Sequence, residues 1–89
     1  MTIEEQLRKH EGNRKFPYVD TVGKVTIGVG RNLTDVGLSG NEIDILLKND
    51  IDRAVADLDR ELSWWRKLNE ARQRVMIDLC FNLGIGSLL

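Results

Sequence analysis

Apolar residues recur at helical spacing in three separate segments of the chain, the first of which lies near its beginning. Thr2 and Glu5 have the spacing of a capping box, and Gly12 is placed to stop a helix in the left-handed conformation. The positions between them that repeat at intervals of four and three are Ile3, Leu7 and His10. This pattern predicts a short helix over residues 3–11.

The second helical segment is the longest. Ser39 and Glu42 have capping-box spacing. The apolar positions that follow at helical intervals are Ile43, Leu47, Ile51 and Val55. We expect a helix over residues 40–61, about 30 Å long at a rise of about 1.5 Å per residue.

The third segment follows a break in the periodicity at residues 63–67, which include two adjacent tryptophans. Asn69 can cap a helix and Gly84 can end one, so we expect a helix over residues 70–83. Its apolar positions are Ala71, Val75, Met76, Leu79, Cys80 and Leu83. Cys80 is the only cysteine, which excludes an internal disulfide, and its apolar surroundings favour a small buried residue over a reactive thiol.

The segment between the first two helices has a different character. Residues 15–34 are rich in aromatic and β-branched residues, with glycines between them. The pattern predicts two or three short antiparallel strands with a turn near residues 21–24. Helices together with a small antiparallel sheet give an α+β fold class. At 89 residues, we expect a single domain over residues 1–89 that is incomplete on its C-terminal side.

Charge and composition exclude several classes of protein. The formal net charge of −1 gives no global electrostatic case for a nucleic-acid partner. Residues 1–5 are acidic where a signal peptide is basic, and no stretch is long and apolar enough for stable membrane insertion. We therefore expect the protein to be made and kept in the cytoplasm. One histidine and one cysteine disfavour both a metal centre and Ser-His-Asp catalysis.

The apolar character of the last residues, 85–89, suggests that more protein once followed. Several apolar residues also need partners that the predicted elements do not obviously supply. They are Ile3, Leu7, Trp64, Trp65, Val75, Met76, Leu79 and Phe81. Because large exposed apolar surfaces promote association, we hypothesise that the last helix repacks or that the chain forms a homo-oligomer through these faces.

Two acidic residues stand at positions suited to acid–base chemistry. Glu11 is at the C-terminal end of the first predicted helix, where the helix dipole disfavours a further negative charge and so favours a protonated carboxyl group. Asp20 lies beside the predicted solvated turn, where a carboxylate stays ionised. Two carboxyl groups in different protonation states are the pair that hydrolysis of a glycosidic bond requires.

Thr26 adds a hydroxyl group to this pair. If residues 21–25 connect the strands, Asp20 and Thr26 oppose each other across the hairpin and share one of its faces. A threonine hydroxyl at that place can hold a water molecule against Asp20. A separation of about 6.5–9.5 Å between the carboxyl groups of Glu11 and Asp20 would suit an inverting mechanism.

Four short motifs, in this order and at compatible spacings, resemble those of the phage-type lysozymes (endolysins). They are LRKHEG at residues 7–12, YVDT at 18–21, TIGVG at 26–30 and DLCFNLG at 78–84. The resemblance implies a lysozyme-like fold of which this chain has the N-terminal lobe and lacks most of the C-terminal lobe. It implies cleavage of the β-1,4 bond between N-acetylmuramic acid and N-acetylglucosamine in bacterial peptidoglycan, by inversion and without metal or cofactor.

The same resemblance assigns roles to individual residues. It makes Glu11 the general acid, Asp20 the carboxylate that activates water, and Thr26 the residue that positions this water. The residues that it implies in the wall of the substrate cleft are Tyr18, Gly28 and Gly30. Arg31 departs from the family, which often has histidine there, at a position that resembles a structural one, so we expect little effect on the chemistry.

Two other interpretations stay open. In the first, the chain is a non-catalytic peptidoglycan-binding or self-assembling fragment of a lysozyme. The length of the chain favours this hypothesis, and its full set of catalytic residue types disfavours it. Alternatively it is a helical protein-binding module that uses Trp64 and Trp65, since aromatic residues also mark interfaces. If activity is present, we expect it to be weak, because one wall of the cleft is missing and the rate depends on holding the sugar close to both acids.

Overall fold

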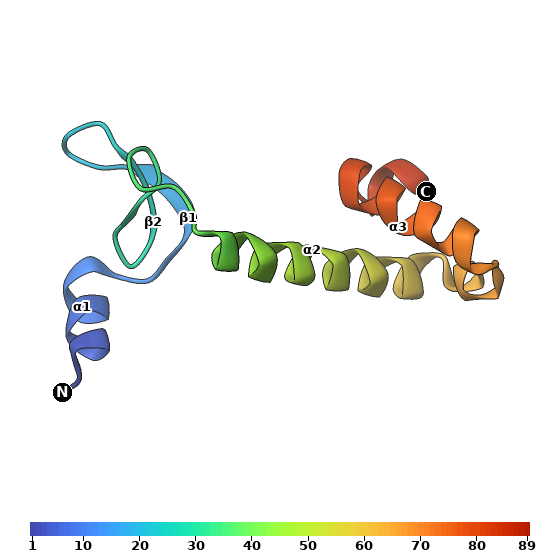
Figure 1. The fold of residues 1–89 in the computed structure, drawn as a ribbon, viewed down its shortest axis with the longest axis horizontal. Coiled ribbons are helices and arrows are strands. Elements are labelled where there is room, and N and C mark those ends of the chain that lie inside the picture. Colours follow the sequence, from blue (N-terminus) through green and yellow to red (C-terminus); the bar gives the residue numbers. More distant parts are fainter. The chain divides into compact units, whose positions relative to one another are not determined.

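The computed structural model describes residues 1–89, which divide into two compact units, residues 1–39 and residues 40–89 (Figure 1). The elements of the first unit are α1 (Ile3–Glu11), β1 (Arg14–Val19), β2 (Val25–Gly28) and β3 (Arg31–Asn32). Those of the second unit are α2 (Gly40–Glu61), the 3-10 helix η1 (Ser63–Lys67), α3 (Glu70–Leu83) and the 3-10 helix η2 (Ile85–Leu88). The α+β class and the three expected helices are confirmed, while the expectation of a single domain stays a prediction.

Helix α1 begins and ends at the residues that the sequence marks. The hydroxyl of Thr2 accepts a hydrogen bond from the backbone N–H of Glu5 and donates one to its carboxylate, both at 3.1 Å. Gly12 ends the helix with φ 86° and ψ −175°. Gly12 thus has the positive φ expected of a glycine that ends a helix, but its ψ lies outside the left-handed helical region. Glycine tolerates this conformation because it has no Cβ atom.

The three strands form one antiparallel sheet in the order β1-β2-β3. Tyr18 pairs with Thr26 and Arg14 pairs with Gly28, so the register of β1 against β2 shifts between these two pairs. Pro17 lies within the shifted stretch. Proline has no N–H group for a strand ladder and is confined to edge strands and bulges, and β1 is an edge strand.

The turn that joins β1 to β2 is built around Asp20. The backbone N–H of Asp20 donates to the carbonyl of Lys24 at 2.9 Å, so the two strands close at these residues. The expected turn near residues 21–24 is confirmed, but the expectation that Asp20 opposes Thr26 is wrong by two residues, because Tyr18 is the partner of Thr26. The cause is the Asp20 carboxylate, which accepts backbone N–H groups from inside the loop and thereby makes Asp20 part of the turn.

The residues after β3 brace the beginning of β2. The backbone N–H of Val25 donates to the hydroxyl of Thr34 at 2.9 Å, and its carbonyl accepts from the N–H of Leu33 at 2.7 Å. The ammonium group of Lys24 forms an ion pair with Asp35 at 3.2 Å. The residue at which the turn closes is thus tied both to β1 and to the loop that follows β3.

In the second unit, α3 folds back over the C-terminal part of α2 (Figure 1). The buried core consists of Ala54, Leu58, Trp65 and Cys80, with Val55, Leu62, Met76, Ile77, Ile85 and Leu88 packed against it. The thiol of Cys80 lies 3.7 Å from the carbonyl oxygen of Ala54, and burial raises the pKa of this thiol. The prediction of a buried, unreactive cysteine agrees with this environment.

The bend between α2 and α3 is fixed by Asp59. Its Oδ1 accepts hydrogen bonds from the indole N–H of Trp65 and from Nε of Arg66, both at 2.8 Å, and its Oδ2 accepts from Nη2 of Arg66 at 2.9 Å. The guanidinium of Arg66 also lies 4.5 Å from the centre of the Trp65 ring. The hydrogen bonds from Arg66 and Trp65 lower the pKa of Asp59 to about 2.

The two adjacent tryptophans have different environments. Trp65 is 1% exposed and is the largest side chain of the core, whereas Trp64 is 51% exposed. A protein-binding module that uses both Trp64 and Trp65 would need both rings at the surface. Only Trp64 is available for contact with a partner.

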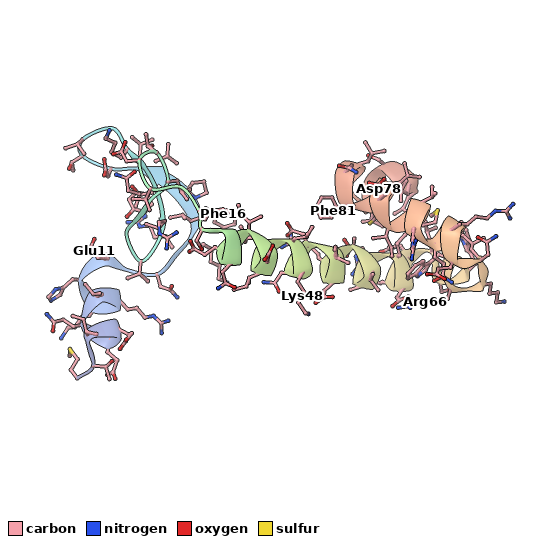
Figure 2. All side chains as sticks on the ribbon, viewed as in Figure 1. Glu11, Phe16, Lys48, Arg66, Asp78 and Phe81 are labelled. Atoms are coloured by element: carbon pink, nitrogen blue, oxygen red, sulfur yellow. The ribbon has the colours of Figure 1, made fainter.

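An apolar groove lies between α2 and α3. It has a volume of about 410 Å³ and is lined by Leu47, Ile51, Arg74, Ile77, Asp78 and Phe81. Figure 2 shows Asp78 and Phe81 on α3. Leu47 and Phe81 are 47% and 42% exposed, so the helical periodicity of these residues does not reflect burial within the unit. None of the helices combines the length and apolar character that are needed to cross a membrane.

We predict that Asp59→Asn lowers the thermal midpoint of unfolding at neutral pH, because a neutral amide cannot keep the charged pair with Arg66. A carboxyl group whose pKa is lowered by folding stabilises the fold fully above its unfolded pKa, and this contribution disappears as the pH falls through the window from about 4 to about 2. The wild type should therefore lose more stability than Asp59→Asn across that window. Tryptophan fluorescence reports this unfolding, because both tryptophans lie in the second unit.

The matched control is Asp52→Asn, which removes an exposed ion pair with Lys48 at 2.8 Å. Exposed pairs of this kind contribute little, so its midpoint should stay close to that of the wild type. Equal midpoints for the wild type and Asp59→Asn at neutral pH would contradict the role given to Asp59.

Candidate active site

All the residues that the sequence proposes for chemistry lie in the first unit. They are Glu11, Tyr18, Asp20, Thr26, Gly28 and Gly30. One comes from the end of α1, two from β1 and its turn, and three from β2 and the turn that follows it. A single compact unit therefore supplies the whole proposed set.

Glu11 is the last residue of α1, and its side chain is exposed (Figure 2). Helix α1 packs against none of the three strands. The side chain of Glu11 nevertheless approaches the turn between β2 and β3: a Cβ atom built on Gly30 would lie 3.6 Å from both its Cγ and its Oε2. The structure thus brings Glu11 and Gly30 together, two residues that are 19 positions apart in the sequence.

Asp20 is half-buried and its carboxylate is held by the backbone of its own turn. Oδ1 accepts a hydrogen bond from the N–H of Val22 at 3.0 Å and one from the N–H of Lys24 at 2.8 Å. Oδ2 takes no part in these turn contacts. The carboxylate therefore has one oxygen fixed by the turn, while the other is left for a further donor such as water.

Thr26 is 5% exposed, and its hydroxyl donates a hydrogen bond to the carbonyl of Lys24 at 3.1 Å. Because the hydroxyl proton is used in this way, the oxygen of Thr26 can meet a further group only as an acceptor. Asp20 faces Lys24 across the turn, and Thr26 lies two residues beyond Lys24 in the direction of β2. Because side chains two residues apart on a strand share a face, Asp20 and Thr26 are diagonal neighbours on one face of the hairpin.

The peptide groups of Lys24 connect these two side chains. The Lys24 N–H donates to the carboxylate of Asp20, and the Lys24 carbonyl accepts from the hydroxyl of Thr26. Lys24 is absent from the residues proposed from the sequence, because a main-chain role leaves no signature in the residue type. The available signal was Asp20 itself: an aspartate followed three positions later by glycine is typical of a turn in which the carboxylate caps the loop.

Tyr18 and Gly28 lie along the same hairpin. Tyr18 pairs with Thr26, and its ring lies 4.6 Å from the guanidinium of Arg14. Gly28 pairs with Arg14 and has φ 68°, in the region that favours glycine. These pairings place Arg14 and Tyr18 on β1 opposite Gly28 and Thr26 on β2.

A model of the phage lysozyme family matches residues 8–89, which include every proposed site residue and span both units. The chain belongs to the phage lysozyme family. Phage lysozymes are peptidoglycan hydrolases, and this family membership agrees with the resemblance carried by the four motifs. No curated protein matches the chain.

Arg31 is the position at which the chain departs from the residue often found in phage lysozymes. It belongs to β3, and its Nη1 donates a hydrogen bond to the carbonyl of Gly37 at 3.2 Å. This contact ties β3 to the end of the first unit. It agrees with the structural role expected for Arg31 from the sequence.

We predict that Asp20→Asn keeps the turn between β1 and β2, whereas Asp20→Ala loosens it. The amide oxygen of asparagine can accept the same two backbone N–H groups as Oδ1, and alanine can accept neither. Leaving these donors without an acceptor should cost the turn about 1 kcal/mol or more. Amide hydrogen exchange at Val22 and Lys24 measures this directly.

The expected result is faster exchange at both amides in Asp20→Ala and near wild-type exchange in Asp20→Asn. Exchange in α1 provides an internal control, since this helix packs against none of the strands. Wild-type protection of both amides in Asp20→Ala would show that the carboxylate does not hold the turn.

Proposed function

We propose that the protein cleaves the β-1,4 bond between N-acetylmuramic acid and N-acetylglucosamine in peptidoglycan, with inversion at the anomeric carbon. Glu11 is the general acid, Asp20 is the base that activates water, and Thr26 positions this water. Tyr18, Gly28 and Gly30 form part of the wall of the substrate site. The coarser assignment, a peptidoglycan hydrolase of the phage lysozyme family, comes from the family match.

The observation that carries the proposal is the arrangement of Asp20 and Thr26 around Lys24. A water molecule that loses a proton to a carboxylate needs one acceptor for the departing proton and benefits from a second acceptor that fixes its orientation. Oδ2 of Asp20 and the hydroxyl oxygen of Thr26 are two such acceptors on one face of the hairpin. Oδ1 of Asp20 already accepts from backbone N–H groups, and the hydroxyl of Thr26 already donates to the Lys24 carbonyl, so both side chains are oriented before substrate binds.

The proposed reaction moves one proton at each end of the scissile bond. Protonated Glu11 donates its proton to the glycosidic oxygen, which leaves as the 4-hydroxyl of N-acetylglucosamine. Asp20 accepts a proton from water, whose oxygen attacks C1 of N-acetylmuramic acid from the opposite face, so that the α-configured product forms. Glu11 is then ionised and Asp20 protonated, and exchange with solvent restores both.

The place of Glu11 in the fold supports its assignment as the proton donor. It is the last residue of α1, and the outer part of its side chain faces the turn between β2 and β3 at Gly30. In its biological setting, the protein acts as a bacteriolytic endolysin that stays in the host cytoplasm until it reaches the cell wall.

We predict that Glu11→Gln and Asp20→Asn each reduce the release of reducing ends from purified peptidoglycan by about 10²-fold or more, since each removes one proton-transfer group. Thr26→Val should also reduce release, because valine has the shape of threonine without its acceptor oxygen. Thr26→Ser should keep most of the activity. A reducing-end assay at matched concentrations measures all four variants.

The matched control is Glu4→Gln, which removes an exposed carboxylate from the same helix as Glu11. It should keep wild-type activity. The proposed role of Glu11 would be lost if Glu11→Gln and Glu4→Gln released reducing ends at the same rate.

The apolar groove between α2 and α3 favours a second candidate function, a self-associating or wall-binding protein without turnover. Its volume of about 410 Å³ and the exposure of Leu47 and Phe81 leave an apolar surface for a second copy of the chain. In that case peptidoglycan would be retained by the protein without release of reducing ends.

We predict that the wild type shows a concentration-dependent increase in mass in sedimentation velocity, and that Phe81→Glu lowers it by placing a charge on the groove. Phe16→Glu is the matched control, because Phe16 is 80% exposed, belongs to the first unit and does not line this groove. A monomer mass at every concentration would exclude association through the groove.

A further inference from the structure

Glu11, the proposed general acid, lies at the end of a helix that does little to fix the position of its side chain. It ends a helix whose other residues are all exposed and which packs against none of the strands. Helix packing therefore does not hold its carboxyl group in one place. A general acid must lie within hydrogen-bond reach of the oxygen that it protonates, so some other contact has to restrict this side chain.

The turn between β2 and β3 comes close to this side chain at Gly30. A Cβ atom built on Gly30 would lie 3.6 Å from Cγ, 3.6 Å from Oε2 and 3.7 Å from Cδ of Glu11. These three atoms belong to the outer part of the glutamate side chain. The backbone of Gly30 thus faces the carboxyl group itself rather than the stem of the side chain.

Glycine is suited to this place for two separate reasons. Its φ is 80°, a conformation that residues with a Cβ atom rarely adopt. In addition, a methyl group would be in van der Waals contact with the carboxyl group, and any larger side chain would extend from an atom that already touches it. The first reason holds for several glycines of the chain, whereas the second holds for Gly30 alone.

We propose that Gly30 is a positioning residue for the proton donor: the turn between β2 and β3 faces the outer part of the Glu11 side chain, and the absence of a side chain at Gly30 leaves room beside the carboxyl group for the leaving oxygen. This goes beyond a role for Gly30 in the cleft wall, and its catalytic consequence rests on the proposed function of Glu11.

The test compares Gly30→Ala with Gly37→Ala. Gly37 belongs to the same unit and has φ 66°, and a methyl group added there would meet no atom within 4 Å. Alanine at this position therefore brings the same kind of backbone strain without a contact to Glu11. Because Gly37 has no part in the proposed site, the pair separates the contact with Glu11 from the general effect of replacing a glycine with positive φ.

The first readout is the ¹³C resonance of the Glu11 carboxyl carbon in protein labelled at glutamate, assigned with Glu11→Gln. We expect Gly30→Ala to move this resonance and Gly37→Ala to leave it in place. This readout needs no turnover, so it tests the contact even if the proposed hydrolysis is absent. An unchanged Glu11 resonance in Gly30→Ala would overturn the proposal.

The second readout is the release of reducing ends at several concentrations of peptidoglycan. We expect Gly30→Ala to lower kcat by about tenfold or more, with a much smaller change in KM, because a methyl group beside the acid occupies the space that the leaving oxygen needs and so affects the reaction more than binding. Gly37→Ala should keep both constants. An unchanged kcat in Gly30→Ala alongside an active wild type would also overturn the proposal.

The two readouts keep this inference separate from the proposed function. A wild type that releases no reducing ends counts against hydrolysis, while the resonance still decides whether Gly30 positions Glu11. Conversely, an active wild type with an unmoved Glu11 resonance in Gly30→Ala supports the hydrolase and excludes the positioning role.

Discussion

The geometry of the site depends on the main chain of Lys24. Its N–H donates to the carboxylate of Asp20, and its carbonyl accepts from the backbone N–H of Asp20 and from the hydroxyl of Thr26. A single residue thus fixes the orientation of both groups that would act on water. The ion pair between the side chain of Lys24 and Asp35 ties this residue to the loop after β3, so the orientation of the pair is coupled to the rest of the first unit.

Each of the two units is stabilised by a different kind of interaction. The second unit has an apolar core around Trp65 and Leu58, and Asp59 fixes the bend that brings its helices together. In the first unit only Thr26 is buried. Its structure therefore rests on turn and strand hydrogen bonds, and a proposed site built there depends on local backbone geometry more than on apolar packing.

Much of this organisation could be predicted from the sequence. The bounds of α1, α2 and α3 follow from capping residues and helical periodicity, because those signals are local. The register of the hairpin could not be predicted in the same way, because it depends on whether Asp20 belongs to the strand or to the turn. The contacts of the Asp20 carboxylate with the N–H groups of Val22 and Lys24 make Asp20 part of the turn. The approach of Gly30 to Glu11 was also beyond the sequence, because it joins segments with no periodic relation.

The central claim is that Asp20 and Thr26 direct a water molecule to the anomeric carbon while Glu11 protonates the leaving oxygen. Its most direct test is proton NMR of the product in the first moments after peptidoglycan fragments meet the wild-type protein, before the anomers of the new reducing end equilibrate. The expected result is that the α-anomer of the N-acetylmuramic acid end appears first. Initial formation of the β-anomer would contradict the claim, because retention requires a carboxylate to attack the sugar in place of water.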